Sequence, residues 1–167
     1  AFGSTGLGTM AQMVLEGFNQ AAGVDILHVP YRGGADALND FLAGNLQVFT
    51  EGNILPHVKA GKARLLAVVD SQRHPDFPDV PLISEIYPGM DMTNWFGMFA
   101  PAGTPDAIVQ RMAAEMNKAA ANPELQAYMI RIALRATASQ PADLSTLLQK
   151  DYARYGKMVK DLNIRMD

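Results

Sequence analysis

Apolar and small residues recur at intervals of three and four over Thr9–Ala21, which predicts an amphipathic helix. Gly23 is expected to end this helix, because glycine accepts the left-handed conformation of a helix C-terminus. The run Val24–Val29 is rich in β-branched residues and half alternating, which predicts a strand that ends at Pro30.

The same unit then repeats twice, with helices that end at glycines and strands that follow them. The predicted elements are a helix over Ala35–Ala43 ended by Gly44, a strand at Leu46–Thr50, a helix at Asn53–Ala60 ended by Gly61, and a strand at Ala63–Val69. Strands that alternate with helices require crossover connections. The sequence therefore predicts an α/β fold with a mainly parallel sheet flanked by helices.

The second part of the chain has a different pattern. Asp70–Pro88 holds four prolines and predicts a surface connection with one short helix over Leu82–Ile86. Met92–Ala100 is apolar and contains the only Trp, and it is followed by Thr104 and Pro105, a typical helix start with Pro at the first helical position.

After that start the composition favours helices. Ile108, Met112 and Met116 form one stripe, and a long helix is expected from Leu144 to Leu162, with one strand near Leu134–Ala138. We expect a boundary near residues 95–105, between a compact βα unit and a mostly helical tail whose apolar stripes pack on a further part of the protein.

The composition limits the classes of function. Apolar residues make up 49% and charged residues 19% of 167, which is typical of a folded globular protein. The net charge is -3 and Lys and Arg are scattered, which disfavours nucleic-acid binding. No apolar stretch is long enough to cross a membrane, and the first residues do not form a signal peptide.

The glycine-rich turn Gly3–Thr9 could hold an anion, because free N–H groups and the helix dipole meet at a helix N-terminus. The candidate contacts are Ser4, Thr5, Gly6, Gly8 and Thr9. The turn is neither a dinucleotide fingerprint nor a phosphate-binding P-loop. An ordinary helix-starting turn remains the alternative interpretation.

Two further turns follow predicted strands, where ligands of open parallel sheets gather. Tyr31 could offer a hydroxyl and an apolar face, Gly33 and Gly34 would let backbone approach a ligand, and Arg32 in such a turn is more often solvated. The second turn supplies three more candidates, Thr50, Glu51 and Asn53. For it, a helix cap by Asn53 with an exposed Glu51 is an equal alternative.

No residue pattern indicates catalysis or a cofactor. His28, His57 and His74 have no metal-ligand spacing, cysteine is absent, and no nucleophile-elbow motif is present. We predict that the protein is not an enzyme and holds no metal or cofactor.

Four blocks stand in order along the chain: His28–Ala35, Leu55–Val68, Pro78–Pro81 and Trp95–Pro105. In this order they resemble the receptors of tripartite tricarboxylate transporters, also called the Bug family of extracytoplasmic solute-binding proteins. The resemblance covers nearly the whole chain, and it implies a periplasmic-binding-protein-like fold with two lobes and a ligand cleft between them.

The resemblance also implies a domain organisation and a function. Residues 1–98 would be most of the second lobe, and residues 99–167 a hinge crossing and a helical return segment that packs on a first lobe not seen in this chain. The protein would capture a small carboxylate in the periplasm of a Gram-negative bacterium and deliver it to membrane transporter subunits. The Gly3–Thr9 turn matches the family's carboxylate-binding turn, and the fragment alone is expected to self-associate through surfaces meant for the first lobe.

Two positions depart from the family pattern. Gln12 stands where many members have a His, which removes a titratable donor. The turn with Glu51 looks shorter than usual, and an anionic Glu51 in the cleft would repel a second ligand carboxylate unless the ligand brought an amino group or Glu51 faced away.

Two other functions remain as alternatives to a solute receptor. One is an enzyme, such as a hydrolase, that acts on a carboxylated substrate, and the other is a sensor or interaction module. A receptor would release its ligand unchanged, so turnover assays separate the first alternative, and the state of association in solution separates the second.

Overall fold

The computed structural model describes residues 1–162 and 164. The chain divides into two compact units, which are Ala1–Asn94 with the chain from Lys157 onward, and Trp95–Gly156. Helix α7, Pro141–Asp161, contributes residues to both units.

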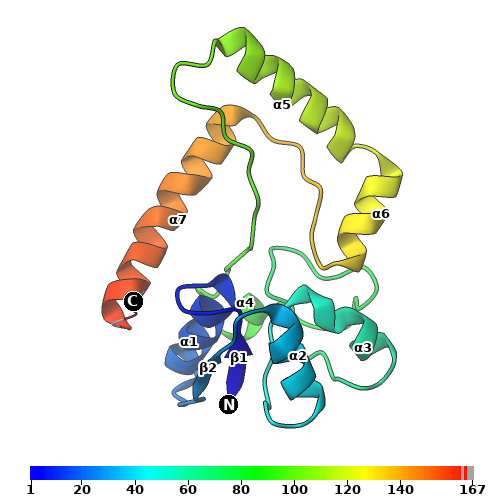
Figure 1. Cartoon of the computed structure of the whole chain (residues 1–167), viewed down its shortest axis with the longest axis vertical. Helices are drawn as coiled ribbons and strands as arrows, with labels where there is room; N and C mark the ends of the chain where they lie inside the picture. The colour runs from blue at the N-terminus through cyan, green and yellow to red at the C-terminus, as the bar shows by residue number, and fades with distance from the viewer. Residues whose placement is uncertain (163, 165–167) are drawn as a thin grey trace. The chain divides into compact units, whose positions relative to one another are not determined.

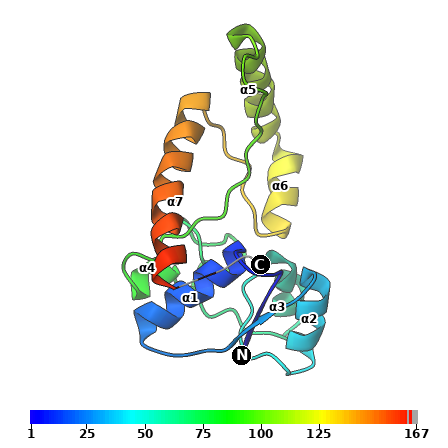
Figure 2. The ribbon, with the colours of Figure 1, turned by 60° about the vertical axis from the view of Figure 1, so that its left-hand side comes forward.

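A pair of parallel strands forms the centre of the first unit. Strands β1, Phe2–Ser4, and β2, His28–Pro30, pair with Phe2 opposite His28 and Ser4 opposite Pro30. Helix α1, Met10–Ala22, makes the crossover between the strands, and α2, Gly34–Leu42, follows β2. Figures 1 and 2 show α1 and α2 on opposite sides of the strand pair. The predicted α/β architecture with parallel strands is confirmed.

The core of this unit lies against the strand pair. Its most buried apolar side chains are Phe2, Ala37, Leu46 and Met92. Gly3 is part of this packing, because a Cβ atom at Gly3 would lie 2.5 Å from Leu46 Cδ1 and 3.3 Å from Ala37 Cβ. Gly3 therefore allows the strand to approach α2 closely.

The glycine positions end the helices as predicted. Gly23, Gly44 and Gly61 adopt φ angles of 65°, 85° and 70°, in the left-handed region that glycine tolerates without steric cost. The first two helices consequently match their predicted ranges within a residue. The third was predicted as one helix over Asn53–Ala60, and the structure instead has a 3₁₀ turn η1, Gly52–Ile54, followed by α3, Leu55–Lys59.

The predicted strands were too long. The strand expected at Val24–Val29 is only His28–Pro30, and it includes the proline at its end. The runs Leu46–Thr50 and Ala63–Val69 contain no named strand, and each makes one isolated parallel bridge, Phe2 with Val48 and Val68 with Leu82. An apolar run becomes a strand only where a partner strand receives its hydrogen bonds.

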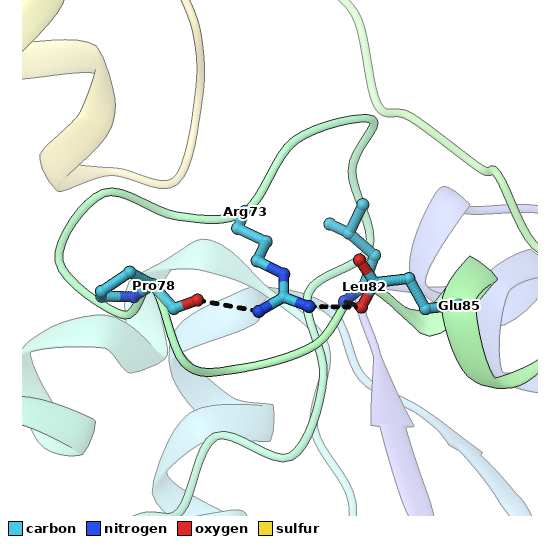
Figure 3. Close-up of polar contacts among 4 residues, drawn as sticks. All are labelled: Arg73, Pro78, Leu82 and Glu85. Carbon is cyan, nitrogen blue, oxygen red and sulfur yellow. Dashed lines mark hydrogen bonds and ion pairs between the residues drawn. The ribbon is translucent and has the colours of Figure 1, made fainter.

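The proline-rich connection is held by Arg73. Its guanidinium donates to Pro78 O at 3.0 Å and pairs with Glu85 Oε2 at 2.8 Å, and the same carboxylate oxygen accepts the Leu82 N–H at 3.2 Å (Figure 3). The predicted short helix is present as α4, Ile83–Ile86. These contacts fix the entry to α4.

The second unit is helical. It contains α5, Asp106–Ala120, and α6, Pro123–Arg131, together with the first part of α7. Helix α5 starts one residue later than predicted: Pro105 is the N-cap, and Thr104 donates its hydroxyl to Pro101 O at 2.8 Å. The strand predicted at Leu134–Ala138 is wrong, because these residues have no regular structure.

Candidate ligand-binding site

The turn from β1 to α1 and the turn from β2 to α2 lie at the same edge of the strand pair. Strands β1 and β2 are parallel and end at Ser4 and Pro30, and the Tyr31 N–H donates to Ser4 O at 2.9 Å. Helices α1 and α2 begin beyond these turns, at N-caps Thr9 and Gly33 that make no side-chain capping hydrogen bond. The edge therefore presents main-chain N–H donors and the positive ends of two helix dipoles.

The hydroxyl of Ser4 is enclosed in the first of these turns. Ser4 is fully buried, and its Oγ lies 2.9 Å from Gly6 O, 3.2 Å from Gly6 N and 2.6 Å from His28 Nε2. A hydroxyl carries one hydrogen, so all three contacts hold together when Ser4 donates to Gly6 O and accepts from His28 Nε2–H. This direction is opposite to that of a serine nucleophile activated by a histidine base.

Two other contacts shape the same turn. The Thr9 hydroxyl also donates to Gly6 O, at 2.9 Å, and the buried Gln12 side chain accepts the Gly8 N–H at 2.8 Å. Gly6 and Gly8 have φ angles of 127° and 71°, which favour glycine. The backbone of the turn is thus held by side chains from its own end, Thr9, and from the first turn of α1, Gln12.

These contacts divide the predicted hydroxyl donors into two kinds. The hydroxyl hydrogens of Ser4 and Thr9 are used within the turn. Thr5 is exposed, and its hydroxyl makes no hydrogen bond with the part of the chain that the structure describes. Thr5 is therefore the hydroxyl of this turn that stays accessible to a ligand, whereas the Gly6 and Gly8 N–H groups already donate to Ser4 and Gln12.

Tyr31 also has a partner of its own. Its hydroxyl donates to Asp40 Oδ2 at 2.7 Å, and Asn45 donates to the other Asp40 oxygen at 3.2 Å. This hydrogen bond, followed by burial, raises the pKa of Tyr31 above its ordinary value. The Tyr31 ring lies beside Gly3, and Arg32 is exposed. What Tyr31 offers a ligand is therefore ring surface.

Residues of all three predicted turns meet around Gly34, the first residue of α2. A Cβ atom at Gly34 would lie 2.6 Å from Glu51 Oε2, 3.4 Å from Asn53 Nδ2 and 3.5 Å from Thr5 Cγ2. We call Thr5, Gly34, Glu51 and Asn53 the Gly34 cluster. A Cβ atom at Gly33 would meet open space. Thr50, which directly precedes Glu51, is half-buried.

Asn53 does not cap the helix that follows it. Its side-chain amide donates to Gly34 O at 3.4 Å, which ties the third turn to the start of α2. The N-cap of η1 is Glu51, without a side-chain capping hydrogen bond. The carboxylate of Glu51 instead turns toward Gly34, and its Oε1 atom is buried with no hydrogen-bond partner in the described chain.

Sequence reasoning missed two residues that build this edge. Asp40 accepts from the Tyr31 hydroxyl, and His28, which the sequence marked only as lacking metal-ligand spacing, contacts Ser4 and stacks on Phe2 with ring centroids 4.8 Å apart. Burial is the main influence on His28 and lowers its pKa, against the opposing charge of Glu16. The available signals were a polar residue in the last turn of α2, Asp40, and one at the start of β2, His28.

The described residues contain no group of three or more His, Asp or Glu side chains placed to hold a metal ion. Among the described helices, none is both long and apolar enough to span a bilayer.

Residues 1–164 match the family described as tripartite tricarboxylate transporter family receptor. Among relatives, a UPF0065 protein of Pseudomonas sp. (strain P51) is 33% identical over 98% of this chain and 50% of its own length. A UPF0065 protein of Pseudomonas knackmussii is 30% identical over 92% of this chain and 94% of its own length. The Bordetella pertussis protein BugT is 34% identical over 71% of this chain and 37% of its own length.

Solved structures share the fold. A periplasmic transporter matches with a TM-score of 0.86 and 26% identity over 100% of this chain and 57% of its own. The R. palustris protein Rpa4515, solved with adipate, matches with a TM-score of 0.81 and 28% identity, over 98% of this chain and 56% of its own.

The chain spans about half the length of the first of these relatives and of both structures. The match nonetheless runs through the strand pair, the three turns and the helices of both units. The chain therefore belongs to the tripartite tricarboxylate transporter family of receptors.

Proposed function

We propose that this chain forms one side of the binding site of a receptor that captures a small carboxylate, such as a dicarboxylate, an amino acid or an aromatic acid. One observation carries the proposal: two helices begin without side-chain caps at the same edge of a parallel strand pair. Main-chain donors at such a position favour a negative ligand group. The structure of the similar protein Rpa4515 with adipate supports a carboxylate as ligand.

The division into two units supports the predicted domain organisation. Residues 1–98 serve as most of the second lobe of the receptor, and residues 99–167 as the hinge crossing and the helical return segment. The change of unit at Trp95 lies near the proposed crossing. The receptor acts in the periplasm and delivers its solute to membrane subunits of a tripartite transporter, in keeping with its family.

Exposed apolar side chains in the second unit support the return segment as a packing surface. Ile108, Met112 and Met116 form the predicted stripe on α5, and they are 54%, 47% and 41% exposed. A chain that keeps such a face open in water is expected to associate with a further copy. Light scattering of the 167-residue chain tests this expectation, and a clean monomer at high concentration contradicts it.

Mass spectrometry of the purified intact receptor under native conditions tests the function. We expect a mass increase that matches a small organic acid, which is lost after unfolding and dialysis. Calorimetric titration of the stripped protein with the released acid should restore binding, with the acid recovered unchanged. Release of a chemically altered acid, or binding of no acid at all, would contradict a receptor.

A further inference from the structure

The Glu51 carboxylate has one oxygen atom without a hydrogen-bond partner in the described chain. Its Oε1 atom is buried and lacks a hydrogen-bond partner among the described residues, whereas Asp40 on the neighbouring helix is bonded on both oxygens, by Tyr31 and Asn45. A buried oxygen of an ionised acid that makes no hydrogen bond is destabilising, and native proteins rarely leave one unpaired. This oxygen is therefore an unused acceptor, which a bound molecule would reach once the Glu51 side chain turns toward it.

Glu51 lies at a favourable place for a carboxylate, but its Oε1 atom has no partner there among the described residues. Glu51 Oε2 lies beside Gly34 at the start of α2, where the helix dipole stabilises a negative group. The chain's own carboxylate thus occupies the start of α2. The start of α1, with the exposed Thr5, remains for the carboxylate of the ligand.

Thr5 and Glu51 both lie against Gly34, so a ligand held at the Gly3–Thr9 turn comes close to the Glu51 carboxylate. Two anionic groups this close repel each other in a partly desolvated site. A second carboxylate on the ligand, directed toward Glu51, would add to this repulsion. A positively charged nitrogen in the same place would remove the repulsion and supply the missing donor.

We propose that Glu51 is a specificity-determining residue that selects an acid bearing an ammonium group. The ammonium N–H donates to Glu51 Oε1, and the carboxylate of the same acid binds at the start of α1. The proposal rests on the proposed function, because it assumes a carboxylate at the Gly3–Thr9 turn. It narrows the solute from small acids in general to zwitterions of the amino-acid type.

Matched ligand pairs test this selection in the intact receptor. Succinate and L-aspartate share one carbon skeleton, as do glutarate and L-glutamate, and butyrate and 4-aminobutyrate, and the members of each pair differ by an amino group. Calorimetric titration should give an affinity about 10- to 100-fold higher for an amino-bearing member, the ratio expected of a charge-assisted hydrogen bond.

Glu51→Gln removes the charge and keeps the shape of the side chain. The variant should lose this preference, because amino-bearing acids bind more weakly and dicarboxylates bind equally well or better. Asp36→Asn is the matched control, since Asp36 is an exposed acid in the first turn of α2 and makes the same change in net charge. The control should keep the wild-type preference.

The outcomes separate the two proposals. Equal binding of both members of every pair, or a Glu51→Gln variant that keeps the wild-type preference, would overturn the role of Glu51 and leave the carboxylate receptor intact. Failure of every acid to bind a correctly folded wild-type receptor would overturn both.

Discussion

The indole N–H of Trp95 donates to Asp151 Oδ2 at 2.6 Å, and this hydrogen bond joins residues that are 56 positions apart. Asp151 is buried on α7, and Trp95 is the first residue of the helical unit. The bond therefore closes that unit on itself, by connecting its first residue to the helix that ends it.

Asp151→Ala leaves the Trp95 indole without its acceptor and should destabilise the helical unit by about 1–3 kcal/mol. Urea unfolding followed by Trp fluorescence measures the loss, because Trp95 is the only Trp of the chain and lies in this unit. Lys150→Ala, an exposed neighbour on α7, serves as control. Equal unfolding midpoints for the two variants would exclude a structural role for the bond.

Gly34→Ala should disturb the Gly34 cluster, because the new Cβ would lie 2.6 Å from Glu51 Oε2. We expect a cost of about 1–3 kcal/mol in stability from this overpacking, together with weaker ligand binding. Scanning calorimetry and ligand titration measure the two effects.

Gly33→Ala is the matched control for that change, since its Cβ meets open space and its φ of -168° is extended backbone open to any residue. Adding Glu51→Ala to Gly34→Ala should recover the lost stability by removing the obstructing carboxylate. If the double variant stays as unstable as Gly34→Ala, the assumed contact is not the cause.

The hydroxyls of Thr5 and Thr9 should have separable effects. Thr9→Val removes the donor to Gly6 O and should lower stability by about 0.5–1.5 kcal/mol. Thr5→Val removes an exposed hydroxyl and should leave the melting temperature unchanged while it weakens carboxylate binding. Thermal unfolding and calorimetric titration of both variants distinguish these roles, and the reverse pattern would show that Thr9 is the ligand contact.

His28 should make stability depend on pH in a defined direction. Its pKa in the folded protein is lowered, chiefly by burial, whereas in the unfolded chain it is about 6.5. The unfolded state thus binds more protons between these values, so stability is complete above about pH 6.5 and falls as the pH drops toward the folded pKa.

Melting temperatures measured from pH 8 down to pH 5 check this dependence. His28→Gln should flatten the part of the slope that lies just below pH 6.5. A slope that persists unaltered in His28→Gln would assign it to other groups.

Local signals in the sequence were sufficient to place α1 and α2. Gly23 and Gly44 end α1 and α2 because the left-handed conformation depends on a single residue, which can be recognised without knowledge of the fold. Strands need a partner, and nothing in Leu46–Thr50 reveals that only Val48 bridges to Phe2. Periodicity likewise predicted α5 but not that Ile108 on its stripe is 54% exposed.

The candidate site shows the same division. The two turns that follow predicted strands were expected at one sheet edge from chain order, whereas the strand before the Gly3–Thr9 turn was not predicted. Thr5, Gly34 and Glu51, from all three turns, do meet there. The engagement of individual hydroxyls was not predictable, because it depends on residues such as Asp40 and His28 that reach the turns from other elements. The contribution of the three turns to ligand binding remains a prediction.

The absence of side-chain caps at the starts of α1 and α2 has a consequence for how such receptors diverge. Every amino acid except proline has a peptide N–H group. A site built from these groups therefore keeps its preference for anionic ligands when most of the surrounding side chains are substituted. A change of ligand specificity then needs only a few substitutions beside the turns, at positions such as that of Glu51.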